Sequence, residues 1–378
     1  MRIAFLTAEY PPLASGGIGT SIWNLGRALT EAGHRAWVIG CGRPTEFDDE
    51  GVKVRFIAPS RVPKMGWLLN RLMLARELDR LVRRESIDVV EAHDWTGLSA
   101  GIRPACVLTV RCHGTATYFA HLTGERVRPS VRWAEGLALR GADAVVSVSR
   151  YTAEVTRDLF KLNAPIGVVP NGIDVRRFTP ADPSEVNPEM ILYFGTLVRK
   201  KGVLDLPRIF AAVLARHPGV RLVLAGRDNP DRRTGCPSTW SLIEQEMPPA
   251  VRKRVTYLGM QPYDRVHEHV RRAGVCVFPA YAEAFPLSWL EAMACARPVV
   301  AYDIGWASEV IESGVSGLLT PPGDTEAMGQ AIAGLLADAE RASALGLGAR
   351  HRIEQKFATS VVAEQLVDHY RRVLESPA

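Results

Sequence analysis

Two glutamates eight residues apart are the most informative residues of this sequence. Glu283 precedes an apolar helical run and Glu291 lies inside it, within the stretch PAYAEAFPLSWLEAMAC. A carboxylate at a helix N-terminus is favoured by the helix dipole, whereas a carboxylate on an apolar helix needs a partner. Because it only accepts hydrogen bonds, a carboxylate suits paired hydroxyls such as a ribose diol. The spacing alone is equally consistent with an alternative. In it, Glu283 is an ordinary charge at a helix N-terminus, and Glu291 reaches solvent from a helix of the core.

Three basic residues follow the apolar run 190–195, namely Arg199, Lys200 and Lys201. A charge run is usually a solvated face, and this is the interpretation for Lys200. For Arg199 and Lys201, a position directly after a strand favours anion binding. Arg can bind two phosphate oxygens at once, and Lys supplies a point charge.

A glycine-rich loop, with Gly16, Gly17 and Gly19, stands ahead of the helical pattern at 20–32. A dinucleotide fingerprint requires G-x-G-x-x-G directly after a strand. Here residues 9–15 intervene and the spacing is G-G-x-G, which argues against NAD and a nicotinamide-dependent oxidoreductase. The loop amides could approach a phosphate closely, although a plain flexible loop remains an alternative.

Short β-rich runs alternate with helical patterns, and the alternation occurs twice. The runs lie at 3–8, 36–40, 52–57, 88–93, 106–111, 144–149 and 166–170, and then at 190–195, 220–226, 254–259, 275–280 and 298–302. Such alternation predicts parallel sheets covered by helices on both faces. The predicted fold class is therefore α/β, with two Rossmann-like doubly wound domains that face each other across a cleft at the carboxyl ends of their strands.

The expected domain boundaries follow composition. Residues 1–180 form the first domain, 181–189 a linker within a Pro-rich polar stretch, and 190–356 the second domain. Residues 357–378 hold a last helical pattern without a strand partner, which we expect to cross back to the first domain.

Composition describes an ordinary globular protein of 378 residues, with 47% apolar and 23% charged residues. The net charge of +5 is too diffuse to indicate nucleic acid. The six cysteines include no C-x2-C pair, and neither a signal peptide nor a membrane-spanning run is visible. These features predict a cytoplasmic protein with reduced thiols.

The helical pattern at 67–84 is amphipathic and basic. One predicted face carries Leu68, Leu74, Leu78 and Val82, and the other carries Arg76, Arg80, Arg83 and Arg84. A helix that packs on the core and has a solvated back is the favoured interpretation. A weak peripheral contact with anionic lipid is the alternative.

Several short motifs occur in an order that resembles a known family. They are the glycine loop with GRALTEAGH, HDW at 93–95, HG at 113–114, NGID with Phe178, FG…KG at 194–202, the glutamate pair in EAFPLSWLEAMACARPVVA, and EVIESGVSGLL at 309–319. Together they resemble the family 4 retaining glycosyltransferases of GT-B architecture (glycosyltransferase group 1), along essentially the whole chain. The resemblance implies transfer of a sugar, with retention of configuration, from a nucleotide diphosphate sugar of the UDP or GDP type to an acceptor hydroxyl. It places the donor mainly on the second domain and the acceptor mainly on the first, and it implies no separate cofactor.

The resemblance also implies roles for single residues. Glu291 matches the residue that holds the ribose, and Glu283 the one near the donor sugar. Arg199 and Lys201 fall in the diphosphate segment, and Gly17 in the loop that closes on the phosphates. The expected donor-binding set is completed by Phe285, Pro286 and Leu287.

In the first domain, His113 matches the histidine beside the reacting sugar, with a satisfied core imidazole as the alternative. The expected catalytic residues are thus His113, Glu283, Arg199 and Lys201. Acceptor or sugar contacts are expected from residues that follow first-domain strands, namely Glu9, His93, Asp94 and Tyr118, although aromatics near strand ends are more often core.

The sequence also departs from the family pattern. Thr196 stands where the family often has Arg, and Pro286 and Ala296 stand where it often has Gly. Without a D-x-D triplet, we expect no metal, and we expect Arg199 and Lys201 to neutralise the diphosphate. A nucleotide-sugar epimerase or hydrolase of the same build, and a non-catalytic sugar-nucleotide-binding protein, are the alternatives.

Overall fold

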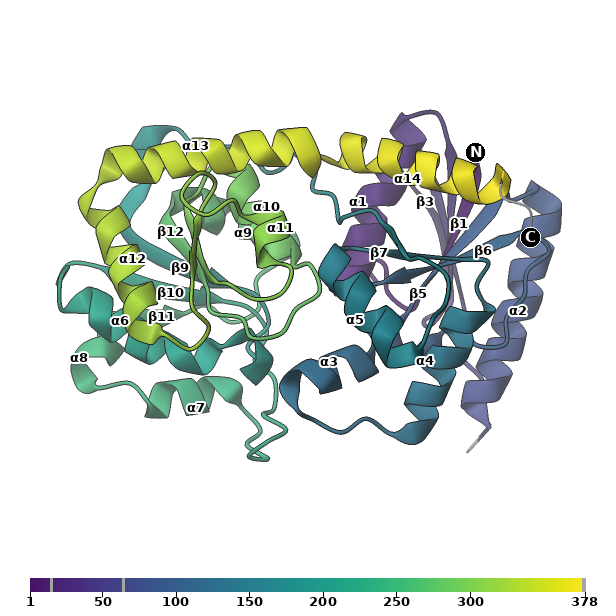
Figure 1. The fold of residues 1–378 in the computed structure, drawn as a ribbon, viewed down its shortest axis with the longest axis horizontal. Helices are drawn as coiled ribbons and strands as arrows, with labels where there is room; N and C mark the ends of the chain where they lie inside the picture. The colour runs from purple at the N-terminus through teal and green to yellow at the C-terminus, as the bar shows by residue number, and fades with distance from the viewer. Residues whose placement is uncertain (14–15, 63–64, 376–378) are drawn as a thin grey trace. The chain divides into compact units, whose positions relative to one another are not determined.

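The computed structural model describes residues 1–13, 16–62 and 65–375 (Figure 1). Contacts divide the chain into one unit of Met1–Gly172 with Phe357–Ala378, and a second unit of Ile173–Lys356. The first unit therefore ends upstream of the expected residue 180. Arg350 accounts for the difference, because its guanidinium donates to the carbonyls of Val175 and Phe178 and ties this segment to the second unit.

The first unit contains an eight-stranded sheet in the order β3-β4-β2-β1-β5-β6-β7-β8. Its strands are β1 (Arg2–Leu6), β2 (Arg35–Cys41), β3 (Thr45–Asp49), β4 (Val52–Ile57), β5 (Val89–His93), β6 (Val107–Cys112), β7 (Ala144–Ser147) and β8 (Gly167–Val168). All neighbours are parallel except β3, which runs antiparallel to β4. The order of the strands reverses between β1 and β5, which makes their carboxyl ends the switch point of the sheet.

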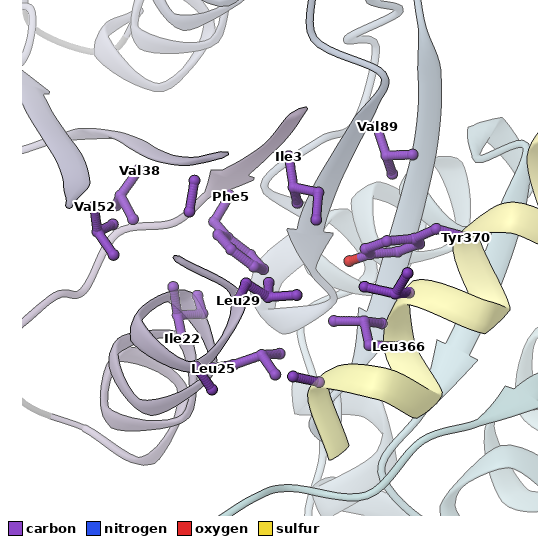
Figure 2. Close-up of a cluster of buried hydrophobic side chains, with 14 of the residues drawn as sticks. Ile3, Phe5, Ile22, Leu25, Leu29, Val38, Val52, Val89, Leu366 and Tyr370 are labelled. Atoms are coloured by element: carbon purple, nitrogen blue, oxygen red, sulfur yellow. The ribbon is translucent and has the colours of Figure 1, made fainter. Parts of the chain in front are cut away.

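Helices cover both faces of this sheet. They are α1 (Gly17–Glu31), α2 (Gly66–Glu85), α3 (Ala116–Thr123), α4 (Pro129–Gly141), α5 (Arg150–Phe160) and α14 (Thr359–Glu375), with a 3-10 turn at Trp95–Gly97. Alternate residues of β1 point to opposite faces. Ile3 and Phe5 pack with α1 and the C-terminal helix α14 (Figure 2), whereas Ala4 and Leu6 join the core that buries α2.

The second unit contains a six-stranded, all-parallel sheet in the order β11-β10-β9-β12-β13-β14. The strands are β9 (Asn187–Phe194), β10 (Arg221–Ala225), β11 (Val255–Tyr257), β12 (Ala273–Phe278), β13 (Val299–Tyr302) and β14 (Leu318–Thr320). The helices are α6 (Leu206–Leu214), α7 (Thr239–Gln245), α8 (Pro249–Arg252), α9 (Tyr263–Arg272), α10 (Leu287–Ala294), α11 (Ala307–Val310), α12 (Thr325–Ala337) and α13 (Ala339–Lys356). This is the doubly wound Rossmann order, with its switch point between β9 and β12.

The predicted fold class, two doubly wound parallel-sheet domains, is confirmed. Two strands were missed: β3 is polar at most positions, and β14 has only three residues. Residues 187–189 of the expected linker open strand β9, and a 3-10 turn at Pro183–Glu185 precedes them. Among the described helices, none combines the length and the apolar composition that crossing a membrane requires.

Candidate active site

The loops after β9 and β12 meet at the switch point of the second unit. Tyr281 and Ala282, beyond β12, donate their backbone N–H groups to the carbonyl of Lys200, at 2.9 and 3.1 Å. On the other side, the N–H of Leu197 donates to the carbonyl of Arg227, beyond β10. Backbone hydrogen bonds thus hold the basic segment between its two neighbours, and its side chains start from fixed positions.

Lys201 and Glu283 form an ion pair at this point, with 2.8 Å between Lys201 Nζ and Glu283 Oε1. Both side chains keep some contact with solvent, at 21% and 13% exposure. Burial on its own would raise the pKa of Glu283, but the charges of Lys201 and Lys200 hold that pKa below its ordinary value. Glu283 is therefore a carboxylate at neutral pH. The site places one partly accessible cation beside one partly accessible anion.

Arg199 faces a different partner from the one the sequence analysis expected. Its Nε and Nη2 donate to the two carboxylate oxygens of Asp231, at 2.9 and 2.8 Å. Asp231 also accepts from the backbone N–H and the hydroxyl of Thr234. A bidentate carboxylate thus occupies one edge of the guanidinium, and the expected contact of Arg199 with a diphosphate stays a prediction. The spacing RKK gave no sign of Asp231, which lies 32 residues further along the chain.

Glu291 lies on α10 and is buried. The hydroxyl of Tyr263, the first residue of α9, donates to Glu291 Oε1 at 3.0 Å. Burial raises the pKa of the Glu291 carboxyl to about 7, against the effect of this hydrogen bond. The guanidinium of Arg177 lies 4.5 Å from the centre of the Tyr263 ring. Sequence reasoning missed Tyr263, because QPY at the start of a helix reads only as a turn.

Three of the residues between the glutamates, the expected donor-binding residues Phe285, Pro286 and Leu287, are buried. Phe285 packs against Trp306, whose indole N–H donates to the carbonyl of Glu283 at 2.8 Å. Pro286 precedes α10, and Leu287 is its first residue. Their buried side chains leave the main chain of this turn as the part that can meet a ligand. Trp306 fixes the backbone from which Glu283 projects.

In the first unit, Asp94 organises the turn after β6. Its two carboxylate oxygens accept from the backbone N–H groups of His113 and Gly114, at 3.0 and 3.1 Å. Burial raises the pKa of Asp94 to about 7. The side chain is fully buried, so it positions the His113–Gly114 peptide and does not face a solvent-borne acceptor. The sequence prediction of a direct acceptor contact by the Asp94 side chain is corrected on this point.

The two histidines at these strand ends are neutral. Burial lowers the pKa of His93 to about 4, and its Nδ1 has no hydrogen-bond partner in the described residues. Burial, with the charge of Arg111 and the neighbouring His93, holds the pKa of His113 well below its ordinary value. His113 is partly exposed while His93 is buried, so an uncharged imidazole of His113 is the one available to a ligand.

Glu9 lies across the glycine loop at the start of α1. Its Oε2 accepts from the N–H of Gly19 at 3.4 Å. A Cβ on Gly16 would come within 2.3 Å of Glu9 Oε2, so the glycine leaves room for the carboxylate. Gly17 is exposed, with nothing within 4 Å of a Cβ added there. The Glu9 side chain therefore belongs to the loop's own structure, and Gly17 is the open position of the loop.

The prediction that the Tyr118 side chain contacts an acceptor or sugar is wrong for this structure. The side chain is fully buried, and its hydroxyl lies 3.3 Å from that of Thr152. Sequence reasoning also missed Glu135, a fully buried carboxylate on α4. It accepts from the N–H of Thr96, in the 3-10 turn after β5, and from the N–H of Ala116, at the start of α3. Glu135 thus joins two turns that border the strand ends.

Comparisons with known proteins show the family to which the chain belongs. Residues 188–338 match the family model described as "Glycosyl transferases group 1", and residues 15–177 match "Glycosyltransferase Family 4". The chain belongs to glycosyltransferase family 4. An alpha-maltose-1-phosphate synthase of Mycolicibacterium smegmatis is 29% identical, over 99% of this chain and 100% of that protein. An N-acetyl-alpha-D-glucosaminyl L-malate synthase of Bacillus anthracis is 25% identical, over 99% and 98%.

Solved structures of similar fold extend over nearly the whole chain. A sucrose-phosphate synthase from Thermosynechococcus elongatus aligns with a TM-score of 0.81 at 22% identity, covering 98% of each chain. An Anabaena protein solved with UDP-glucose aligns with a TM-score of 0.73 at 20% identity, covering 98% of this chain and 100% of that one. These neighbours establish the GT-B type of fold. As a family 4 glycosyltransferase, the protein takes its sugar from a nucleotide sugar.

Proposed function

We propose that the protein transfers a hexose, with retention of configuration and without a divalent metal, from a UDP- or GDP-type sugar to an acceptor hydroxyl. The Lys201–Glu283 pair carries this proposal. It lies where the strand order reverses between β9 and β12, the position at which doubly wound sheets bind their ligands. It also brings together the two charges that transfer of a glycosyl group from a diphosphate requires.

The donor would lie across the loops of the second unit. Glu291 would accept hydrogen bonds from the ribose hydroxyls, at the carboxylate to which the Tyr263 hydroxyl donates in this structure. Lys201 would contact the diphosphate, and Glu283 would lie at the sugar. Arg199 would act through Asp231, by holding the loop after β9 against the loop after β10. The solved Anabaena protein with bound UDP-glucose supports a nucleotide sugar of this kind.

The charges that develop during transfer explain the choice of residues. Breaking the bond between C1 and the diphosphate oxygen leaves negative charge on the diphosphate and oxocarbenium character on the sugar. Lys201 would stabilise the first and the Glu283 carboxylate the second. The acceptor oxygen would bond to C1 on the face that the diphosphate leaves, and its proton would pass to the departing phosphate oxygen. Backbone hydrogen bonds hold the loop that carries Lys201 before the substrate arrives, so its side chain starts from a fixed main chain.

The first unit would contribute a neutral histidine to the sugar. The low pKa of His113 keeps its imidazole uncharged at physiological pH, so it can accept or donate a hydrogen bond without opposing the oxocarbenium charge. Asp94 would fix the backbone of His113. Gly17, in open space at the start of α1, would let backbone amides approach the phosphates.

Donor screening tests the proposal. The protein is incubated with UDP-glucose, UDP-N-acetylglucosamine and GDP-mannose, each with and without candidate sugar acceptors, and released nucleotide and product are followed by NMR. We expect one donor to be consumed and an acceptor-dependent product with the donor's anomeric configuration to form. A product that forms equally well without acceptor, with the sugar epimerised or released, would instead identify an epimerase or hydrolase.

A further inference from the structure

The exposed face of helix α2 carries apolar side chains near its N-terminus and mostly basic side chains near its C-terminus. Its inner face is core, since Leu74, Leu78 and Val82 are buried. The outer face follows steps of three and four residues along the helix, which place its members on one side. Its exposed members are Met65, Leu68, Leu72, Arg76, Arg80 and Arg83, and the half-buried Asp79 lies among the arginines. The face is therefore apolar over its first turns and basic over its last turns, and Leu68 belongs to it rather than to the core side that its spacing predicted.

Three exposed tryptophans belong to segments near the apolar end, beside this face rather than on it. Trp67, 57% exposed, follows Met65, and Arg71 on the same helix donates to the carbonyls of Thr96 and Gly97. This contact brings the start of α2 beside the turn that begins with Trp95. That turn packs on α4, because a Cβ on Gly97 would lie 2.4 Å from the backbone of Ala134, and the preceding residue, Trp133, is 60% exposed.

Soluble proteins seldom expose so many large apolar side chains in one area. Two further members of this area are Leu72, 47% exposed, and Met73, 36% exposed. The basic end is equally exposed, with side-chain values of 74% for Arg80 and 62% for Arg84. Arg80 pairs with Glu77 and Arg84 with Glu85, whereas Arg76 and Arg83 form no ion pair within the described part of the chain.

We propose that this face of α2, with Trp67, Trp95 and Trp133 beside its first turns, docks the protein on an anionic lipid surface. Leucine, methionine and tryptophan side chains partition into the boundary between headgroups and acyl chains. Arginines beside them bind lipid phosphates, each contributing about 1 kcal/mol near an anionic surface. The apolar and basic ends of one helix face thus match the two layers that a bilayer presents.

Two other occupants fit the same face less well. A glycan would need hydrogen-bonding groups among the aromatic rings, and the apolar end offers Met65, Leu68 and Leu72 instead. A second copy of the chain would set the arginines of one helix against the arginines or the apolar end of the other, and this leaves charges without partners.

Vesicle co-sedimentation tests the proposal with the full chain. We expect binding to vesicles of phosphatidylcholine mixed with phosphatidylglycerol, weaker binding as salt rises, and little binding to phosphatidylcholine alone. Leu68→Ser with Leu72→Ser should reduce binding at least tenfold. Arg76→Gln with Arg83→Gln should reduce it roughly fivefold for each arginine removed. All four side chains are on the surface, so the variants should fold, which circular dichroism checks.

Matched controls come from the second unit. Leu347 on α13 is 62% exposed, and Arg232 and Arg233 are both exposed. Leu347→Ser, and Arg232→Gln with Arg233→Gln, should leave vesicle binding unchanged. The proposal is overturned if the wild type binds neither vesicle, or if the α2 variants bind like these controls. It is also overturned if sedimentation velocity shows a dimer that Leu68→Ser with Leu72→Ser abolishes, or if an immobilised glycan, rather than lipid, captures the protein through α2.

Discussion

Lys201 and Glu283 form an ion pair, with 2.8 Å between Lys201 Nζ and Glu283 Oε1. A bound diphosphate would compete with Glu283 for the same ammonium group. The carboxylate would then be freed beside the sugar as positive charge develops there, and the pair would act as a switch that the donor itself operates. Any substitution of one residue removes the ion-pair partner of the other, so variants of this pair have to be interpreted together.

Lys201→Ala should weaken nucleotide diphosphate binding by about 1.5–3 kcal/mol, the scale of a hydrogen bond to a charged group. Titration calorimetry with UDP and GDP measures it. Because this variant leaves Glu283 unpaired near the phosphates, the same change is made in a Glu283→Gln background, where the loss should persist. Lys253→Ala, an exposed lysine of the same unit, is the control. Unchanged affinity for the nucleotide that binds would show that Lys201 does not contact the diphosphate.

Glu291 gives a prediction about stability and pH. Its pKa is about 7 in the folded protein, against 4.5 ordinarily. The folded state therefore binds the proton more tightly, and stability falls as pH rises from about 4.5 to about 7. Glutamine does not titrate, so Glu291→Gln removes this loss. Relative to wild type, the free energy of unfolding of the variant should rise by about 3 kcal/mol between about pH 4.5 and pH 7. Urea unfolding at pH 5 and pH 8 measures the difference. Glu340→Gln, at an exposed position of α13, should follow the wild type, and parallel curves for Glu291→Gln would contradict the pKa assignment.

At this scale, the sequence located residues better than it located their partners. The sequence could place Lys201, Glu283 and Glu291 near one edge of the sheet because each follows a strand or lies on the helix after it, and strand ends can be predicted from apolar runs. Asp231, Tyr263 and Glu135 were not found, because their roles come from contacts with distant parts of the chain. Tyr118 was misassigned because the burial of an aromatic beside a strand end depends on packing that spacing does not reveal.

The elements of the second unit hold the site through tight backbone approaches. Gly202, between Lys201 and α6, has φ +66°, and an added Cβ would lie 1.6 Å from the carbonyl oxygen of Pro279. Only glycine lets the loops after β9 and β12 come this close. Ala296, after α10, also has a positive φ of 53° but carries a side chain. A non-glycine residue in this region is strained.

Substitutions at these two positions should have opposite effects. Gly202→Ala should destabilise the protein by more than about 2 kcal/mol, because strain adds to overlap with the Pro279 carbonyl. Ala296→Gly should stabilise it by about 0.5–1 kcal/mol, since relief of strain exceeds the added freedom of the unfolded chain. Denaturant unfolding of both variants decides this. If both variants changed the free energy of unfolding in the same direction, backbone strain would not determine the stability of this unit at these positions.

The sequence predicted the long elements well. The apolar runs that it marked as strands form the parallel sheets, because strands covered on both faces must be apolar along their whole length. The strands β3 and β14 were not predicted, because β3 is polar at most positions and β14 has only three residues. The end of the first unit was misplaced because Arg350, far along the chain, draws residues 175–178 into the second unit.

At the scale of the whole molecule, the proposal assigns donor chemistry to the second unit and acceptor chemistry to the first. It requires that basic side chains, rather than a cation, neutralise the leaving diphosphate. Turnover should therefore continue in EDTA at the rate seen in untreated buffer, with added Mg²⁺ or Mn²⁺ changing it little. If turnover were lost in EDTA and restored by either cation, a metal ion rather than basic side chains would neutralise the leaving diphosphate.

The roles of the two glutamates are the central claim, and one paired measurement tests it most directly. Nucleotide Kd, kcat and the anomeric configuration of the product are determined for wild type, Glu283→Gln and Glu291→Gln. Glu283 should strengthen its contacts as the sugar becomes an oxocarbenium, so its variant should lose kcat and keep most nucleotide affinity. Glu291→Gln should mainly lose affinity, and the wild type should retain the donor's configuration. An inverted product, or two variants that cannot be distinguished from wild type, would contradict the account.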